Sequence, residues 1–213
     1  MTKEDLIEVL DYFKKSNFRV DYRVTDSKGI GEFEEKINFI IETKGSETIS
    51  SYATLLKKNI QKAINHLEIN KANFSEVKEF LYTNNLFQSL VLAKNERAFL
   101  KITKDIPLDI RTAQTKDKKE LVAILLSVTY LQKVYLIFPY SNDLGRKYQA
   151  MSLLIHDIIS QSEYEVIDFE GSSIESIANF YQQFGAQKEK YWAMTWKRFF
   201  LNLFKSNLLK INR

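Results

Sequence analysis

The sequence reads VYLIFPYSNDLGRKYQAM over residues 134–151. It opens with an apolar run typical of a buried strand, passes through a polar turn, and enters a helical pattern that continues to about residue 162. A strand that leads into a helix N-terminus brings backbone N–H groups and the positive end of the helix dipole to one point. This stretch therefore predicts an anion site, and Arg146 and Lys147 add positive charge beside it.

Further strand and helix patterns lie on both sides of this stretch. Downstream, VIDFEGS (166–172) is a strand pattern that ends in acids and glycine, and a helical pattern covers residues 173–184 before a last strand candidate at 191–196. Upstream, strand patterns at residues 108–115 and 120–130 are joined by a short polar turn, which is typical of an antiparallel meander. The fold class predicted is therefore α/β (α+β), with a mixed, mostly antiparallel sheet flanked by helices.

The N-terminal half has the same mixture of patterns. We expect helices over residues 2–15, 46–67, 74–84 and 87–104, and strands over residues 18–25 and 36–43. Residues 1–45 are expected to form an extension packed on a main domain at 46–213, although no linker rich in Pro, Gly or Ser marks a boundary.

Composition narrows the function classes. The chain has 213 residues and no cysteine, which excludes disulfides, thiolate metal sites and a cysteine nucleophile. The N-terminal MTKED does not resemble a signal peptide and no long apolar run is present, so we expect a cytoplasmic protein. A balance of 31 basic against 27 acidic residues suits an anionic ligand but is too weak to indicate DNA binding.

Two pairs of segments carry a resemblance to a known family. VIDFEGS followed by IANFYQQFGA (177–186) resembles GNAT acyltransferases, especially the GNAT-like group related to Fem-type (FemAB-like) peptidyltransferases. KINFIIET (36–43) followed by YATLLKKNIQKAINHL (52–67) is similar to a strand and basic helix of that group. The resemblance covers about residues 36–196 and implies the GNAT fold. Fem-type relatives carry two such halves, and only the second is expected to be complete here.

The resemblance implies that acetyl-CoA or another acyl-CoA binds where residues 134–151 pass from strand to helix. The residues expected to bind it are Phe138, Tyr140, Gly145, Arg146, Lys147, Gln149 and Ala150. Gln149 departs from the family pattern, which has glycine at this position, and its side chain could crowd the pyrophosphate.

The resemblance also suggests catalytic residues. Tyr181 matches the tyrosine that protonates the departing CoA thiolate in many GNAT enzymes; the alternative is a core aromatic on an amphipathic helix. Asp168 and Glu170 alternate on one strand and so share a face. Either carboxylate could take the proton from an attacking amine, with Glu170 favoured because it lies nearer the loop. The alternative for both is a helix cap or an ion pair.

Other charged groups leave alternatives open. The helix face with Lys57, Lys58 and Lys62 could meet a tRNA-borne or nucleotide-linked group, or could simply be solvated. His66 and His156 have no partner at ligand spacing, so no metal site is predicted. The basic, apolar tail at residues 197–213 could contact an anionic membrane surface, but packing on the domain is favoured.

These features lead to one main functional hypothesis and two alternatives. The first is an N-acyltransferase that moves an acyl group from acyl-CoA to a primary amine. The second is a Fem-like transferase that uses aminoacyl-tRNA and acts on a cell-wall precursor. The third is a non-catalytic GNAT-fold binding module, which Gln149 would favour. An isolated half would also expose apolar surface, so a homodimer is expected.

Overall fold

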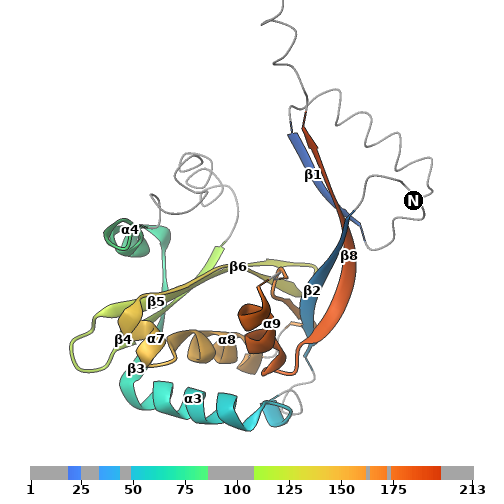
Figure 1. Cartoon of the computed structure of the whole chain (residues 1–213). Coiled ribbons are helices and arrows are strands. Elements are labelled where there is room, and N and C mark those ends of the chain that lie inside the picture. The colour runs from blue at the N-terminus through green and yellow to red at the C-terminus, as the bar shows by residue number, and fades with distance from the viewer. Residues whose placement is uncertain are drawn as a thin grey trace, which may run out of the picture. The chain divides into compact units, whose positions relative to one another are not determined.

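A computed structural model describes residues 19–24, 34–43, 49–85, 108–161, 164–171 and 174–197 (Figure 1). The chain forms two compact units, residues 1–37 with 190–213 and residues 38–189. The helices expected at residues 2–15 and 87–104 lie outside the described residues, as does the tail beyond residue 197. The division expected between residues 45 and 46 stays a prediction.

The strands form a mixed sheet. They are β1 (Arg19–Val24), β2 (Glu34–Glu42), β3 (Leu67–Ala72), β4 (Leu108–Thr115), β5 (Leu121–Tyr130), β6 (Lys133–Ser141), β7 (Val166–Asp168) and β8 (Gln187–Lys197). Their order is β1-β8-β2-β7-β6-β5-β4-β3. The β6–β7 pair is parallel, whereas β1–β8, β2–β7, β3–β4, β4–β5 and β5–β6 are antiparallel. The expected mixed, mostly antiparallel sheet is confirmed.

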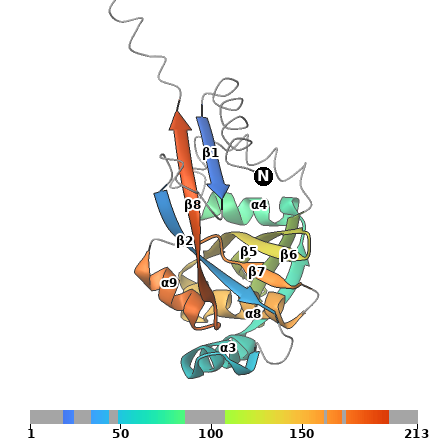
Figure 2. The ribbon, with the colours of Figure 1, turned by 90° about the vertical axis from the view of Figure 1, so that its right-hand side faces the viewer.

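Helices cover both faces of the sheet in the unit formed by residues 38–189 (Figures 1 and 2). They are α3 (Thr54–His66), α4 (Phe74–Thr83), α7 (Asp143–Lys147), α8 (Ala150–Ser160) and α9 (Glu175–Gln182). Side chains of α3, α8 and α9 form one buried cluster with β2, β5, β6 and β7, whereas α4 packs in a second cluster against β4 and β5.

Strand β5 belongs to both clusters, which explains its uninterrupted apolar sequence. Ala123 and Leu125 lie in the cluster of α3, α8 and α9, whereas Ile124 and Leu126 lie in the cluster of α4. Successive side chains of a strand point to opposite faces of a sheet, so a strand covered on both faces needs apolar residues at every position. This strand therefore forms the centre of the fold.

The structure corrects the expected elements in two places. The helix expected from residue 146 to 162 is interrupted, because α7 ends at Lys147 and α8 begins at Ala150. Strand β3 was not predicted, since it follows the end of α3 directly, without a glycine or proline between them.

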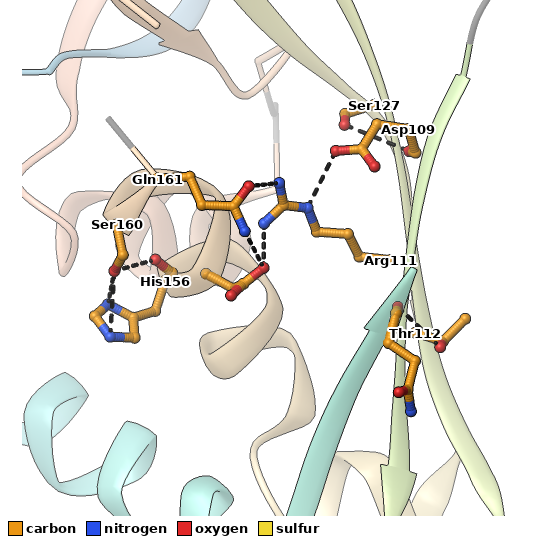
Figure 3. Close-up of polar contacts among 9 residues, drawn as sticks. Asp109, Arg111, Thr112, Ser127, His156, Ser160 and Gln161 are labelled. Carbon is orange, nitrogen blue, oxygen red and sulfur yellow. Dashed lines mark hydrogen bonds and ion pairs between the residues drawn. The ribbon is translucent and has the colours of Figure 1, made fainter. Parts of the chain in front are cut away.

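A buried charged cluster joins β4 to α8 (Figure 3). The Arg111 side chain is 1% exposed, and its Nε lies 3.1 Å from Asp109 Oδ2. Nη1 pairs with Asp157, and Nη2 donates to Gln161 Oε1 at 2.7 Å. Each nitrogen of the guanidinium thus has a partner, as a buried charge requires. The cluster fixes the C-terminal part of α8 against the sheet.

Candidate functional site

The connection from β6 to α8 folds tightly against β5. Asn142 caps α7, because its Oδ1 accepts a hydrogen bond from the Gly145 N–H at 2.8 Å. The Asn142 N–H in turn donates to the Val122 carbonyl at 3.0 Å. Gly145 is buried, and a Cβ at this position would lie 2.3 Å from the Val122 oxygen. The glycine therefore allows the connection to approach β5 closely.

Gln149 separates α7 from α8 and has a left-handed backbone conformation, with φ 63° and ψ 36°. This conformation favours glycine, which explains why the family pattern has glycine at the matching position. The Gln149 side chain does not cap α8; its Nε2 instead donates to the Arg146 carbonyl at 3.2 Å. The N–H groups in the first turn of α8 therefore have no side-chain cap, as at helix N-termini that bind anions.

A cavity of about 230 Å³ lies at this N-terminus, lined by Ser141, Gly145, Arg146, Gln149, Ala150, Met151, Ser152 and Phe180. The Arg146 guanidinium pairs with Asp143 and donates to the Ser141 carbonyl at 2.5 Å. The Ser141 hydroxyl is buried and has no hydrogen-bond partner among the described residues. The cavity thus lies at an uncapped helix N-terminus, beside an arginine whose charge is paired with Asp143.

Strand β7 is short and pairs with only the first part of β6. The two strands pair only where Lys133, Val134 and Tyr135 lie beside Val166, Ile167 and Asp168. On its other side β6 pairs with β5 from Lys133 to Ser141, with a register shift that places Leu136 opposite Ser127 and Phe138 opposite Leu126. Ile137 is therefore the extra residue of a β-bulge, and bulges are common beside active sites.

Asp168 lies at the end of β7 and is 4% exposed. Its Oδ2 pairs with Lys133 Nζ at 2.7 Å, and its Oδ1 accepts from Asn38 Nδ2 at 2.9 Å and from the Glu170 N–H at 2.8 Å. Burial of Lys133 lowers its pKa, but the hydrogen bond and the charge of Asp168 outweigh this, so the pKa of Lys133 is raised. Contacts with three donors favour the ion-pair alternative for Asp168.

Glu170 lies two residues beyond, and its N–H donates a hydrogen bond to the Asp168 carboxylate. Its backbone has φ 61°, a conformation that disfavours residues other than glycine and asparagine, and Gly171 follows with φ 75°. The Glu170 residue is half-buried. Other described residues, among them Lys119 and Gln149, share this conformation, so a role of Glu170 as proton acceptor stays a prediction.

Tyr181 lies in the core rather than on the cavity. Its ring centroid is 4.5 Å from that of Phe169 and 5.9 Å from that of Phe39. Burial raises its pKa, which keeps the phenol protonated. The neighbouring Phe180 lines the cavity instead. Packing favours the structural alternative for Tyr181, and a role as an acid stays a prediction.

The remaining predicted cofactor residues divide between two places. Gly145, Arg146, Gln149 and Ala150 line the cavity. Phe138 and Tyr140 pack against the cluster of α4, on the other face of the sheet. Lys147 is exposed, with its Nζ 5.7 Å from the centroid of the Tyr148 ring, which itself stacks on His66 at 4.5 Å.

Sequence reasoning missed four residues of the cavity wall: Ser141, Met151, Ser152 and Phe180. Ser141 and Ser152 are the polar ones. Neither serine belongs to a recognisable motif. Both reach the same cavity only because the chain turns at Gln149 and α9 packs beside it. Within the described part of the chain, no group of His, Cys, Asp and Glu side chains could hold a metal ion.

None of the helices in the described ranges combines the length and apolarity needed to cross a bilayer.

Comparison with solved structures shows which proteins share this fold. FemX superposes with a TM-score of 0.63 at 10% identity, over 90% of this chain and 77% of FemX. The C-terminal domain of a putative lysylphosphatidylglycerol synthetase from Agrobacterium fabrum gives 0.56 at 12% identity, over 90% and 72%. A tandem GNAT protein from the clavulanic acid biosynthesis pathway gives 0.51 at 9% identity, over 90% and 68%.

No protein-family model matches the chain, and no curated protein matches its sequence. The structural similarities confirm the expected GNAT-like fold and its likeness to Fem-type proteins.

Proposed function

We propose that this protein is an N-acyltransferase that moves an acyl group from acyl-CoA to a primary amine. The observation that carries the proposal is the cavity of about 230 Å³ at the uncapped N-terminus of α8. The fold is that of known GNAT proteins, and a fold alone does not determine function, so the argument depends on this site.

The residues of the cavity fit a phosphate-bearing donor. The N–H groups of Ala150, Met151 and Ser152 belong to the first turn of α8, where helical hydrogen bonding leaves donors unused. Arg146, which lines the cavity, adds a positive charge. Together these groups would hold the pyrophosphate of the donor.

When bound, acyl-CoA supplies a thioester carbonyl that an amine can attack. Glu170, whose N–H is held by the Asp168 carboxylate, would accept the proton that the amine must lose. The departing thiolate would take a proton from solvent, because Tyr181 packs in the core against Phe169 and does not line the cavity.

Calorimetric titration of acetyl-CoA into the native protein and into Gln149→Gly tests the proposal. Micromolar binding by the native protein is expected, because the Gln149 side chain bonds to the Arg146 carbonyl. Binding by Gln149→Gly alone would mean that Gln149 blocks the site, and the native protein would then be a non-catalytic module. Absence of binding by both proteins would contradict the acyl-CoA proposal.

A second candidate function, transfer from aminoacyl-tRNA, is favoured by helix α3. The helix carries Lys57, Lys58 and Lys62, all exposed, and contains no acidic residue. Such a surface suits a phosphate backbone. Filter binding of tRNA to the native protein and to a variant with these lysines changed to glutamine tests this candidate. Affinity that falls with salt and is lost in the variant would favour it over acyl-CoA.

A further inference from the structure

The sheet face that carries α4 continues beyond this helix as an apolar surface. On this face α4 packs with Ile110 of β4 and with Ile124 and Leu126 of β5 (Figure 1). Because alternate residues of a strand share a face, Val128 and Tyr130 of β5 lie on the same face as Leu126. Neither residue belongs to the two buried clusters of the described residues, and Tyr130 is 64% exposed. The apolar face of the sheet is thus larger than the part that α4 covers.

Strand β6 continues the same surface. Tyr135 lies opposite Val128 in the register of the two strands and therefore shares its face. Ile137, two residues further along β6, is 39% exposed, whereas Tyr135 is half-buried. The turn between the strands adds the exposed Leu131. We call these five side chains the hairpin patch: Val128, Tyr130, Leu131, Tyr135 and Ile137.

The turn of this hairpin holds an apolar side chain in a strained position. Leu131 and Gln132 have φ angles of 46° and 60°, in the left-handed region that asparagine and glycine usually occupy in two-residue turns. The Leu131 residue is 80% exposed, so little packing offsets the strain. The Glu165 N–H donates to the Gln132 carbonyl at 2.9 Å, which ties the turn to the chain before β7. A contiguous apolar surface held in this way is typical of a protein contact.

The charges beside the hairpin patch indicate the kind of partner. Lys133 lies opposite Tyr130, but its Nζ pairs with Asp168 at 2.7 Å and lies 5.1 Å from the centroid of the Tyr135 ring. Glu165, which bonds to the turn, is exposed and acidic. The described residues around the patch therefore offer no unpaired cation to a nucleic acid or an anionic membrane. A second copy of the same apolar surface needs no such cation, because the surface is its own complement.

The size of the hairpin patch also fits a dimer. From the exposed fractions above, its five side chains offer roughly 400 Å² of each copy. A stable interface takes about 800 Å² from each partner, arranged as an apolar core inside a polar rim. The patch is therefore large enough for the core of such an interface, and the exposed Thr129 and Gln132 would belong to its rim.

We propose that the hairpin patch is the contact between two copies of this chain in a homodimer. Two-fold symmetry would place the same five side chains of each copy against one another. The cavity at the N-terminus of α8 is lined by residues of α8 and by Phe180 of α9, which pack on the other face of the sheet, so the contact would leave it open. The proposal does not depend on acyl-CoA or on any ligand of that cavity.

Sedimentation of the native protein and of a Tyr130→Lys, Ile137→Lys double variant tests the proposal. The native protein is expected to form a dimer at micromolar concentrations. The double variant should dimerise roughly a hundredfold more weakly, because four lysines would then meet in one contact. Leu55→Lys is the matched control, since Leu55 lies on α3 and is 59% exposed, and it should leave the dimer intact.

Two further variants separate a lost contact from a folding defect. A Tyr130→Glu, Ile137→Glu double variant should be monomeric alone but should dimerise when it is mixed with the lysine variant, because opposite charges then meet across the patch. Leu131→Asn should fold at least as stably as the native protein, since asparagine tolerates the left-handed conformation, and should weaken the dimer about tenfold. A monomeric native protein would overturn the proposal. A lysine variant that dimerises as tightly as Leu55→Lys would also overturn it.

Discussion

At the scale of single residues, the candidate site depends on backbone positions that tolerate little change. Gly145 lies so close to β5 that a methyl group would meet the Val122 carbonyl at 2.3 Å. Gln149 occupies a left-handed conformation that glycine would adopt more easily. The first position explains why glycine is retained, and the second shows that this chain accepts strain beside the cavity.

Gly145→Ala is expected to destabilise the protein by about 2 kcal/mol, since the added methyl group must displace the α7 segment from β5. Urea unfolding measures this change. The same displacement should weaken pyrophosphate binding, because Gly145 lines the cavity. An unchanged urea midpoint would show that Gly145 does not lie as close to the Val122 carbonyl as the structure indicates.

His156 predicts a pH dependence of stability. Burial lowers its pKa, and the charge of Asp157 only partly opposes this. The folded protein then binds the proton less readily than the unfolded chain does. Neutral His156 therefore contributes fully to stability at pH values above about 6.5, the pKa of histidine in the unfolded chain. This contribution is lost as the pH falls below that value. Between pH 7.5 and pH 5, His156→Gln should therefore lose less free energy of unfolding than the native protein. Equal losses of unfolding free energy in the variant and the native protein would contradict the prediction.

At the scale of elements, the attachment of α8 to the sheet determines where its N-terminus lies. The Arg111 cluster fixes the other end of this helix to β4 (Figure 3). Apolar residues of α8, among them Leu154, Ile155 and Ile158, fill the space between. The cavity therefore lies at the end of a helix that is held along its whole length.

Arg111→Met is expected to cost about 3 kcal/mol, because it leaves Asp109 and Asp157 without their buried cation. Chemical denaturation measures this cost. Lys119→Met provides the control, since its ion pair with Glu68 lies on the surface, and it should leave the midpoint unchanged. Equal effects of the two changes would mean that Arg111 contributes no more than a surface pair.

The elements show what a sequence can and cannot predict. The pattern at residues 108–115 predicted β4, because apolar and polar residues alternate along a strand whichever strands lie beside it. It did not reveal that Arg111 is buried, since two of its partners, Asp157 and Gln161, lie far along the chain. The break at Gln149 lacks a glycine or proline, so the helical pattern runs through it. Ser141 and Phe180 lie in the patterned segments at 134–151 and 177–186, but only the fold shows that both line one cavity.

At the scale of the whole molecule, the two compact units differ in how their strands are supported. Strand β5 pairs on both sides and is covered by helices on both faces. Strand β1 ends the strand order and, within the described residues, pairs only with β8. An edge strand has a partner on one side only, so β1 should open more easily than β5.

Hydrogen–deuterium exchange tests this difference. Amides of β1 should exchange orders of magnitude faster than those of β5, because opening the β1–β8 ladder breaks few contacts whereas exposing β5 requires global unfolding. Exchange at two protein concentrations, with light scattering in parallel, also tests the expected homodimer. Protection of β1 that rises with concentration would show that a second copy covers this unit. Protection of β1 equal to that of β5 in a monomer would contradict the prediction, because the edge strand would then be as stable as the core of the sheet.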